Sequence, residues 1–503
     1  MCRHCLTILL NFLAMVLLGQ DPSEATSILQ AGIKTMGGDS LLKKIQSLHY
    51  TAYAYRNAIE QSERPDGPFI FAPYQVEMDI NLDRKKLVRY AAGQFFTFPD
   101  TVNAYADTLS YAEKNGPGFS VQIPDRMIQD EFDLSPSSLF NTALRAAHLK
   151  REPDTILQKN PQQVISFNWR RYPVRIFINQ CTHFLTACEV TKPYNDDYSN
   201  IWGDSKKMVY YSLWYLEEGG LHYPRQKDVY LNGWHYYSEI IEGLEFNKPK
   251  TSIDIPDSIR RTTEQLESAM YSQYEKAIAA RAKEIRKGIW VIGGPCNTTL
   301  VEEENGIILI EAAVSSEYAN LILKKTHALF PSKKILAMVT TSDAWLHIGG
   351  LREFAANQIP IYHLDLNRWI INKLLTATYF SKPDNWEKTI NKRPVLISIA
   401  NRQSIGSGPN RLELIPYRTE TGERMMMVYF PVQKLIYASD LYQPKGINGS
   451  YWEPHYPFEF ISAVESQQIL VDSVYAMHLA HPIPYREIRQ DVERLIPASK
   501  VPH

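Results

Sequence analysis

One loop of this 503-residue chain carries side chains that can bind a cation or move a proton. It follows an apolar strand predicted at Ile335–Val339 and contains Ser342, Asp343 and His347. Imidazole and carboxylate groups bind zinc, iron and manganese, and a carboxylate beside a bound water can accept its proton. The loop therefore predicts metal-assisted chemistry, with His347 as a ligand and Asp343 as a catalytic group.

Residues of the same kind end two apolar segments further along the chain. Asp440 follows the run MMMVYFPVQKLIYAS, and His478 ends the run VYAM, with His481 three residues later. Two histidines and one carboxylate are enough for a mononuclear site with open positions.

A metal ion held in this way would have a defined chemical use. It would lower the pKa of bound water from about 15.7 to about 7 and so supply hydroxide near neutral pH. Asp440 or Asp343 would orient that water for attack on an ester, amide or phosphoester. The same residues also have structural interpretations: His347 can pack at a helix start, Ser342 and Asp343 can cap a helix, and Asp440 can bind backbone amides.

The elements around these residues alternate between strands and helices after about residue 288. Three short strands lead to an amphipathic helix, and strand, helix, strand and helix then follow as far as about residue 380. The second predicted helix opens at Gly349-Gly350. Strands alternating with helices predict sheets covered by helices.

This order resembles the metallo-β-lactamase family over about Gly288–His481. Four landmarks carry the resemblance, in sequence order: Glu311 after the opening hairpin, Gly349-Gly350, Ser439-Asp440, and the strand that ends at His478. The resemblance implies an αββα sandwich of the metallo-hydrolase type.

The chain departs from the family at most of the metal ligands. The loop has Ser342, Ala344 and Leu346 at three ligand positions, and Arg418 lies near the place of another histidine. Alanine and leucine cannot bind a cation, so a two-zinc centre cannot form. The resemblance implies at most one weakly held zinc, iron or manganese ion, or none. Its ligands would be His347, Asp440 and either His478 or His481, with His478 favoured because it directly ends the apolar strand. Ser342, Trp345, Arg418 and His481 are then expected to line the pocket, and hydrolysis without metal by Asp343, His347 and Arg418 is the remaining catalytic alternative.

The N-terminal half has a different pattern. A helix is predicted near Thr26–Leu48, followed by short alternating strands to about Asn247 with a helical interruption at Ser137–Leu149. The order resembles the LolA-like lipoprotein-sorting family over about Ile28–Ile255. That resemblance implies a curved half-barrel able to hold an acyl chain; the alternative is an ordinary β-core filled by aromatic side chains.

The first 20 residues have the pattern of a secretory signal. A basic start precedes the apolar run Leu6–Leu18, which suits a signal core and is too short to span a bilayer. We expect export to the periplasm or cell envelope, or secretion, with an uncleaved anchor or a buried helix as alternatives. No other segment is apolar enough to cross a membrane. If exported, Cys181 and Cys188 can form a disulfide; otherwise they are small buried residues.

Length and composition complete the prediction. A chain of 503 residues exceeds one core, and we expect an α+β protein with a signal at 1–20, a half-barrel at 26–257, a helical connector at 258–287 and a sandwich at 288–503. The net charge of −1 gives no sign of nucleic-acid binding. The predicted function is an exported, eroded and at most mononuclear metallo-hydrolase. The alternative is a non-catalytic envelope protein that binds a small apolar or lipid-like ligand.

Overall fold

The computed structural model describes residues 22–495 apart from several segments. The segments not described are 58, 60–67, 70, 84–85, 93–100, 107–109, 116–117, 121–129, 194–201, 249–271, 273–274, 277, 279–281, 295, 312–313, 419–423, 446–450 and 452–454. The predicted signal and most of the predicted helical connector therefore lie outside the described residues. Among the residues described, no helix is both long enough and apolar enough to span a bilayer.

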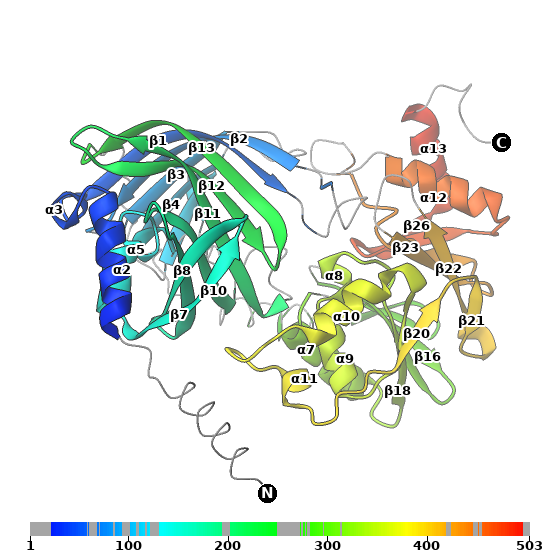
Figure 1. The fold of residues 1–503 in the computed structure, drawn as a ribbon. Coiled ribbons are helices and arrows are strands. Elements are labelled where there is room, and N and C mark those ends of the chain that lie inside the picture. The colour runs from blue at the N-terminus through cyan, green and yellow to red at the C-terminus, as the bar shows by residue number, and fades with distance from the viewer. Residues whose placement is uncertain are drawn as a thin grey trace, which may run out of the picture.

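The N-terminal half is built on one antiparallel sheet of 13 strands, which curves strongly (Figure 1). Its strand order is β6-β5-β4-β3-β2-β1-β13-β12-β11-β10-β9-β8-β7, so the first and last strands of the half lie next to each other. The strands are β1 (Ser47–Asn57), β2 (Phe71–Asn81), β3 (Lys86–Ala92), β4 (Thr101–Ala106), β5 (Ser110–Asn115), β6 (Gly118–Ser120), β7 (Ala147–Leu157), β8 (Asn160–Trp169), β9 (Tyr172–Asn179), β10 (Leu185–Pro193), β11 (Asp204–Leu216), β12 (His222–Leu231) and β13 (Trp234–Phe246).

One face of this sheet packs on short helices. Along β1 the even-numbered residues from Leu48 to Ala54 are buried, whereas Thr51, Tyr53 and Tyr55 are exposed. The buried face shares its core with apolar side chains of α2 (Pro22–Thr35) and α5 (Leu139–Arg145), and α3 (Asp39–Leu42) and α4 (Asp130–Asp133) lie in the same half. Alternation of period two therefore separates an inner, apolar face from an outer face.

The predicted helices of this half are shorter in the structure. Apolar residues at positions 25, 28, 29 and 33 give α2 its buried stripe, and the positive φ angles of Gly37 (117°) and Gly38 (95°) end the helical stretch there. The structure has strand β1 from Ser47, and β7 begins at Ala147, inside the predicted helix Ser137–Leu149. Both helix predictions were right in kind and too long at their C-terminal ends.

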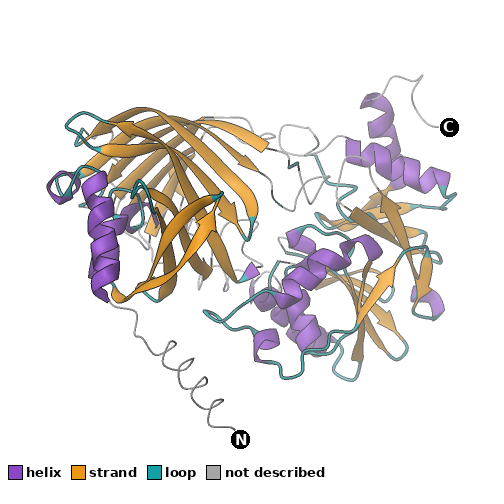
Figure 2. Cartoon of the chain, in the orientation of Figure 1, coloured by secondary structure: helices purple, strands orange, loops and turns teal. Residues whose placement is uncertain are grey.

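The C-terminal half contains two smaller sheets with helices alternating between strands (Figure 2). The first has seven strands: β14 (Ala282–Arg286), β15 (Ile289–Ile292), β16 (Thr298–Glu303), β17 (Gly306–Ile310), β18 (Lys334–Val339), β19 (Ile361–Leu364) and β20 (Leu396–Ile399). Strands β14 to β17 are antiparallel, and β17 to β20 are parallel. The second has six: β21 (Gln403–Ile405), β22 (Leu412–Arg418), β23 (Arg424–Phe430), β24 (Leu435–Tyr437), β25 (Ser473–Ala476) and β26 (Leu479–Pro484).

The helices of this half divide between the two sheets. They are α7 (Ser316–Leu329), α8 (Trp345–Ile348), α9 (Leu351–Ala356), α10 (Arg368–Thr376), α11 (Asn385–Lys388), α12 (His455–Ser466) and α13 (Tyr485–Leu495), with single 3-10 turns η3 (Asp365–Asn367) and η4 (Gly408–Asn410). Residues Met426, Val428 and Phe430 of β23 share a core with the first sheet and with α7, α9 and α10. Their neighbours Met425 and Met427 share a core with α12 and α13. Successive side chains of the run MMMVYF therefore point alternately into one core and the other. The layers of this half run helix, sheet, sheet, helix.

Comparison with the sequence predictions gives one confirmation and two differences. The chain is a mixed α/β protein with one large antiparallel sheet and further sheets. Residues Ala282–Arg286, expected at the end of a helical connector, form strand β14 instead, because a turn at Lys287-Gly288 (φ 76° at the glycine) pairs them with β15. The described cysteines are free: Cys181 is exposed, and Cys188 and Cys296 are buried, so Cys181 and Cys188 form no disulfide.

Candidate functional site

The loop after β18 is held by backbone contacts to the segment after β17. Val314 donates its N–H to the carbonyl of Leu346 at 3.0 Å. A Cβ on Gly349 would lie 2.1 Å from the carbonyl oxygen of Val314, so only glycine fits there. The sequence predicted that a helix opens at Gly349-Gly350. In the structure, helix α8 already begins at Trp345, and Gly349-Gly350 joins α8 to α9.

His347 lies fully buried between two carboxylates from different elements. Its Nε2 is 3.0 Å from Oδ2 of Asp440, and its Nδ1 is 3.0 Å from Oε2 of Glu311. Burial alone would lower the pKa of His347, but Glu311 and Asp440 outweigh it and hold that pKa well above its usual range. The ring thus lies between the end of β17 and the loop after β24.

The two carboxylates are themselves held in place. Glu311 adopts a left-handed backbone conformation (φ 77°), as does Ser439 (φ 54°) beside Asp440. The hydroxyl of Thr341 contacts the Glu311 carboxylate and lies 2.7 Å from the Ser439 hydroxyl. Non-glycine residues in this conformation are uncommon, and they gather here within one small cluster.

Asp343 faces away from this cluster toward Arg424. Its Oδ2 accepts a hydrogen bond from Nε of Arg424 at 2.8 Å, and its Oδ1 accepts one from the Arg424 backbone at 3.3 Å. Burial raises the pKa of Asp343, and Arg424 opposes that effect. The carboxylate is thus engaged by a cation of β23 that the sequence prediction did not include.

The remaining predicted residues are placed differently from one another. His478 is 29% exposed, with its Nε2 3.5 Å from Oδ1 of Asp440. Ser342 is buried and accepts a hydrogen bond from the backbone of Ala344 at 3.1 Å, as a turn-capping residue does. Trp345 packs against the cores of both halves of the chain. His481 is exposed on β26, and Arg418 ends β22.

The predicted metal ligands can be tested for fit by their distances. Among the residues described, the ligand atoms of His347, Asp440 and His478 do not all lie within 4.8 Å of one another. The Nε2 of His347 is hydrogen-bonded to Asp440, whereas Nδ1 of His347, Oε2 of Glu311 and Oδ1 of Asp440 are buried without a hydrogen-bond partner in the described part of the chain. The role of His347, Asp440 and His478 as metal ligands stays a prediction.

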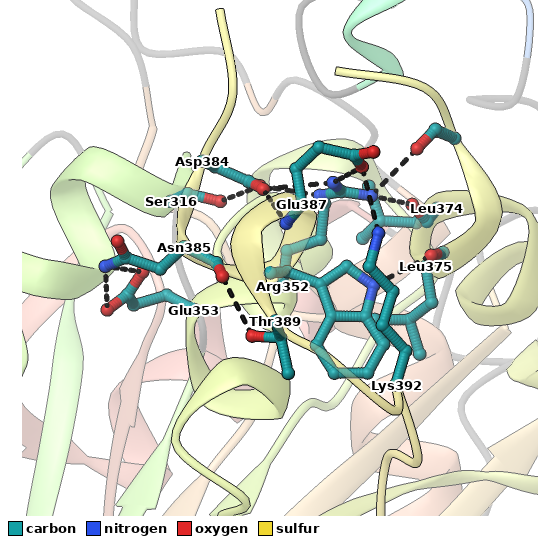
Figure 3. A network of polar contacts seen from close by, with 12 residues as sticks. Ser316, Arg352, Glu353, Leu374, Leu375, Asp384, Asn385, Glu387, Thr389 and Lys392 are labelled. Carbon is teal, nitrogen blue, oxygen red and sulfur yellow. Dashed lines mark hydrogen bonds and ion pairs between the residues drawn. The ribbon is translucent and has the colours of Figure 1, made fainter. Parts of the chain in front are cut away.

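A second network fixes the helices behind this loop (Figure 3). Arg352 of α9 is fully buried and donates to both carboxylate oxygens of Asp384, at 2.6 and 3.0 Å. It also donates to the carbonyls of Leu374 and Ala377, each at 3.0 Å, and to Glu387 at 3.2 Å. Because the Arg352 guanidinium donates hydrogen bonds to Asp384, Leu374, Ala377 and Glu387, it holds α9, α10 and α11 together. Its role is structural.

A separate cavity lies inside the curved sheet, next to α4. Its volume is about 50 Å³. Its walls combine apolar residues with tyrosines and four charged side chains: Tyr50, Ile80, Asp130, Glu131, Leu134, Ser135, Pro136, Cys188, Val190, Lys207, Val209, Tyr211, Tyr223, Pro224, Lys227, Val229 and Ile241. The sequence prediction of a ligand space in this half named none of these residues.

The charges of the cavity form two ion-paired groups. Asp130 pairs with both Lys192 and Lys207, the latter at 2.8 Å. Burial would raise the pKa of Asp130, but the two lysines outweigh it and lower that pKa. Lys227 lies 3.1 Å from Glu131 and 3.2 Å from Glu239, and although burial would lower the pKa of Lys227, these carboxylates raise it well above its usual value.

Comparison with known proteins found matches among solved structures alone. No family model and no curated protein matches the sequence. A metallo-β-lactamase from Pontibacter korlensis is 14% identical, over 43% of this chain and 98% of that one, with a TM-score of 0.33. The metallo-β-lactamase FIM-1 from Pseudomonas aeruginosa in its mono-zinc form is 18% identical, over 44% and 96%, with a TM-score of 0.31.

A further match is a stereoselective inverting sec-alkylsulfatase from Pseudomonas sp., 16% identical with a TM-score of 0.31. It covers 42% of this chain, and this chain spans 40% of its length. With TM-scores below 0.5 in each case, the proposals below rest on the residues of this chain.

Proposed function

We propose that this protein binds an amphiphilic ligand inside its 13-stranded sheet and that its C-terminal half is a metallo-β-lactamase-like scaffold without a working metal centre. The observation that carries the proposal is the cavity, in which apolar walls surround ion-paired charges. The exported location expected from the first 20 residues, and the division into two domains, belong to the same proposal.

Buried charges favour a binding role for this cavity over a purely structural one. Moving a charged group from water into the protein interior costs roughly several kcal/mol. Apolar residues alone could fill the same volume without that cost. Lys207 is nevertheless buried at the cavity wall, and Lys227, which also lines the cavity, is only 16% exposed. Charged groups kept in a cavity of this kind are candidates for binding a polar group of a ligand.

The two ion-paired groups suggest the chemistry of that ligand. Asp130 pairs with Lys192 and Lys207, and Lys227 pairs with Glu131 and Glu239, so charged groups of both signs lie at or beside the cavity wall. A polar head group would therefore lie toward these ion pairs, with an apolar chain along Val190, Val209 and Ile241. A cavity of about 50 Å³ has room for only a few waters at about 10–15 Å³ each, so binding of a larger ligand requires the apolar side chains that line the cavity to move apart.

A matched pair of substitutions on β13 tests this proposal. Ile241 lines the cavity, whereas its neighbour Ile240 is exposed on the outer face. Ile241→Trp would fill the cavity and weaken binding of a fluorescent fatty acid to the full chain by about tenfold or more, about 1.4 kcal/mol. Ile240→Trp would leave binding unchanged. Equal binding by both variants, or no binding by the unsubstituted chain, would reject the proposal.

A second candidate function is hydrolysis without metal at Asp440 and His478. It is favoured by the partial exposure of His478 and the 3.5 Å between its Nε2 and Oδ1 of Asp440. In such a dyad His478 accepts a proton from an attacking water, and Asp440 stabilises the imidazolium that forms.

Aryl esters, phosphate esters and sulfate esters are suitable substrates for testing the second candidate, with and without a chelator. The candidate predicts activity that persists in chelator and is lost in His478→Gln but not in His481→Gln, where the histidine is exposed on β26. Absence of turnover, or turnover unaffected by His478→Gln, rejects it. Activity lost on chelation would instead support the predicted mononuclear metal site.

A further inference from the structure

Three side chains that bind metals gather on the outer face of the curved sheet, away from the cavity. His49 on β1 is paired in register with Asp79 on β2, and Glu77 precedes Asp79 by two residues on the same face of β2. Their neighbours Leu48, Tyr50, Met78 and Ile80 point into the inner core. The strand register alone therefore brings an imidazole and two carboxylates together.

The distances within this group suit a cation. One ligand atom from each of His49, Glu77 and Asp79 can be chosen so that all three lie within 4.8 Å of one another. The Nδ1 of His49 is 2.9 Å from Oδ1 of Asp79, and its Nε2 is 3.9 Å from Oε1 of Glu77. Metal bonds of about 2.0–2.2 Å place tetrahedral ligands roughly 3.4 Å apart, so a small shift of Glu77 would close the site.

The state of the His49 ring adds a second observation. Its side chain is 3% exposed, and its Nε2 faces Oε1 of Glu77 at 3.9 Å, too far for a hydrogen bond. Asp79 holds the other ring nitrogen. A carboxylate on one nitrogen fixes the ring and leaves the second nitrogen aimed at a metal, which is the usual arrangement around metal-bound histidine.

We propose that His49, Glu77 and Asp79 form a binding site for one divalent transition-metal ion, with zinc as the best match. One imidazole nitrogen with carboxylate oxygens suits zinc or manganese better than magnesium or calcium, which prefer oxygen ligands alone. His49 and Glu77 bind the ion directly, and Asp79 either orients His49 or joins as a third ligand. Glu245, paired with His49 on β13, lies on the same face beside the site.

Access to the site is through Glu77, whose side chain is 44% exposed, while His49 and Asp79 are buried beneath it. An ion would thus connect β1 and β2 near the start of β1. The site shares no residue with the cavity or with His347, so it is independent of the proposed function.

Zinc titration of the dialysed full chain by calorimetry tests this inference. We expect one zinc ion per chain, with affinity weakened by about tenfold or more in Glu77→Gln and by about 10–100-fold in Asp79→Asn. Matched controls are His148→Gln, on the exposed side of β7, and His478→Gln, in the other predicted metal site; neither should change the affinity.

Because His49 is buried, His49→Gln is checked for a folded spectrum before its affinity is read. Glu77→Gln changes a half-exposed side chain and keeps the test valid if His49→Gln does not fold. Absence of zinc binding, or binding unchanged by Glu77→Gln and Asp79→Asn, overturns the proposal. Loss of binding in His478→Gln alone would assign the ion to the C-terminal half and also overturn it.

Discussion

At the scale of single residues, His347 is a buried histidine placed between two buried carboxylates, those of Glu311 and Asp440. The sequence predicted that His347, Asp440 and His478 approach one another, and Asp440 does contact both histidines. That convergence was predictable because each residue follows a strand in a recognisable order. The contact of His347 with Glu311 was not, because it depends on a left-handed backbone at Glu311 that no local pattern indicated.

Replacement of His347 by glutamine should be strongly destabilising. Glu311 and Asp440 would remain buried without their shared cation, which costs about 3–5 kcal/mol. Urea unfolding measures the difference. His478→Gln is the control, since its side chain is partly exposed and its loss should cost less than about 1 kcal/mol. Equal stability of the two variants would contradict the ion-paired arrangement.

The charges of the cavity predict loss of stability in acid. The pKa values of Asp130 and Glu239 are lowered in the fold. Burial would raise both, but Lys192 and Lys207 outweigh it at Asp130, and Lys227, the Tyr237 hydroxyl and Arg89 outweigh it at Glu239. Groups with a lowered folded pKa stabilise the fold above their unfolded values, about 3.9 and 4.3, and this stability is lost as pH falls through the folded values.

Thermal unfolding between pH 7 and pH 3 measures this effect. The melting temperature should fall below about pH 4, and Asp130→Asn should flatten that fall because one of the two titrating groups is gone. An acid transition of the same steepness in Asp130→Asn would show that other carboxylates control it.

At the scale of elements, strand patterns were read from the sequence more reliably than helix ends. Alternation identified β1, because a half-buried strand repeats every two residues, whereas continuous apolar runs identified β18 and β23. Helix ends depended on tertiary pairing: Ala282–Arg286 are good helix formers in isolation, yet a glycine turn pairs them as β14. Likewise α8 starts four residues before Gly349, because contacts to Val314 fix the loop.

Gly349→Ala tests the contact that fixes this loop. The new Cβ would lie 2.1 Å from a backbone oxygen of Val314, which cannot rotate away, so we expect destabilisation of about 1–3 kcal/mol. Gly243→Ala is the comparison, because its Cβ would meet only the Thr51 hydroxyl, a side-chain atom that can move. Chemical denaturation should separate the two; a Gly349→Ala chain as stable as the unsubstituted one would contradict the close packing.

At the scale of the whole molecule, specific contacts join the curved sheet to the C-terminal half. The backbone N–H of Asp204 donates to the carbonyl of Thr378 at 2.7 Å, and the carboxylate of Asp204 accepts from the Ser381 backbone at 3.0 Å. Lys373 of α10 places its Nζ 4.6 Å from the ring centre of Trp202 and 5.5 Å from that of Trp234. These contacts were not predictable from sequence, because they join residues more than a hundred positions apart.

Lys373→Met should weaken the coupling between the two halves. A cation over an aromatic ring contributes about 0.5–2 kcal/mol, so its loss should broaden or split the calorimetric unfolding transition. Lys324→Met, an exposed position on α7, should leave the transition unchanged. An identical thermogram for both variants would show that the halves are joined by other contacts.

The central claim, that the curved sheet holds an amphiphilic ligand, is tested most directly by native mass spectrometry of the full chain. We predict a bound mass of one amphiphile on the unsubstituted chain and on Ile240→Trp, and its absence from Ile241→Trp, in which the cavity is filled. Bare polypeptide mass for all three chains, even after incubation with fatty acid, would contradict the claim.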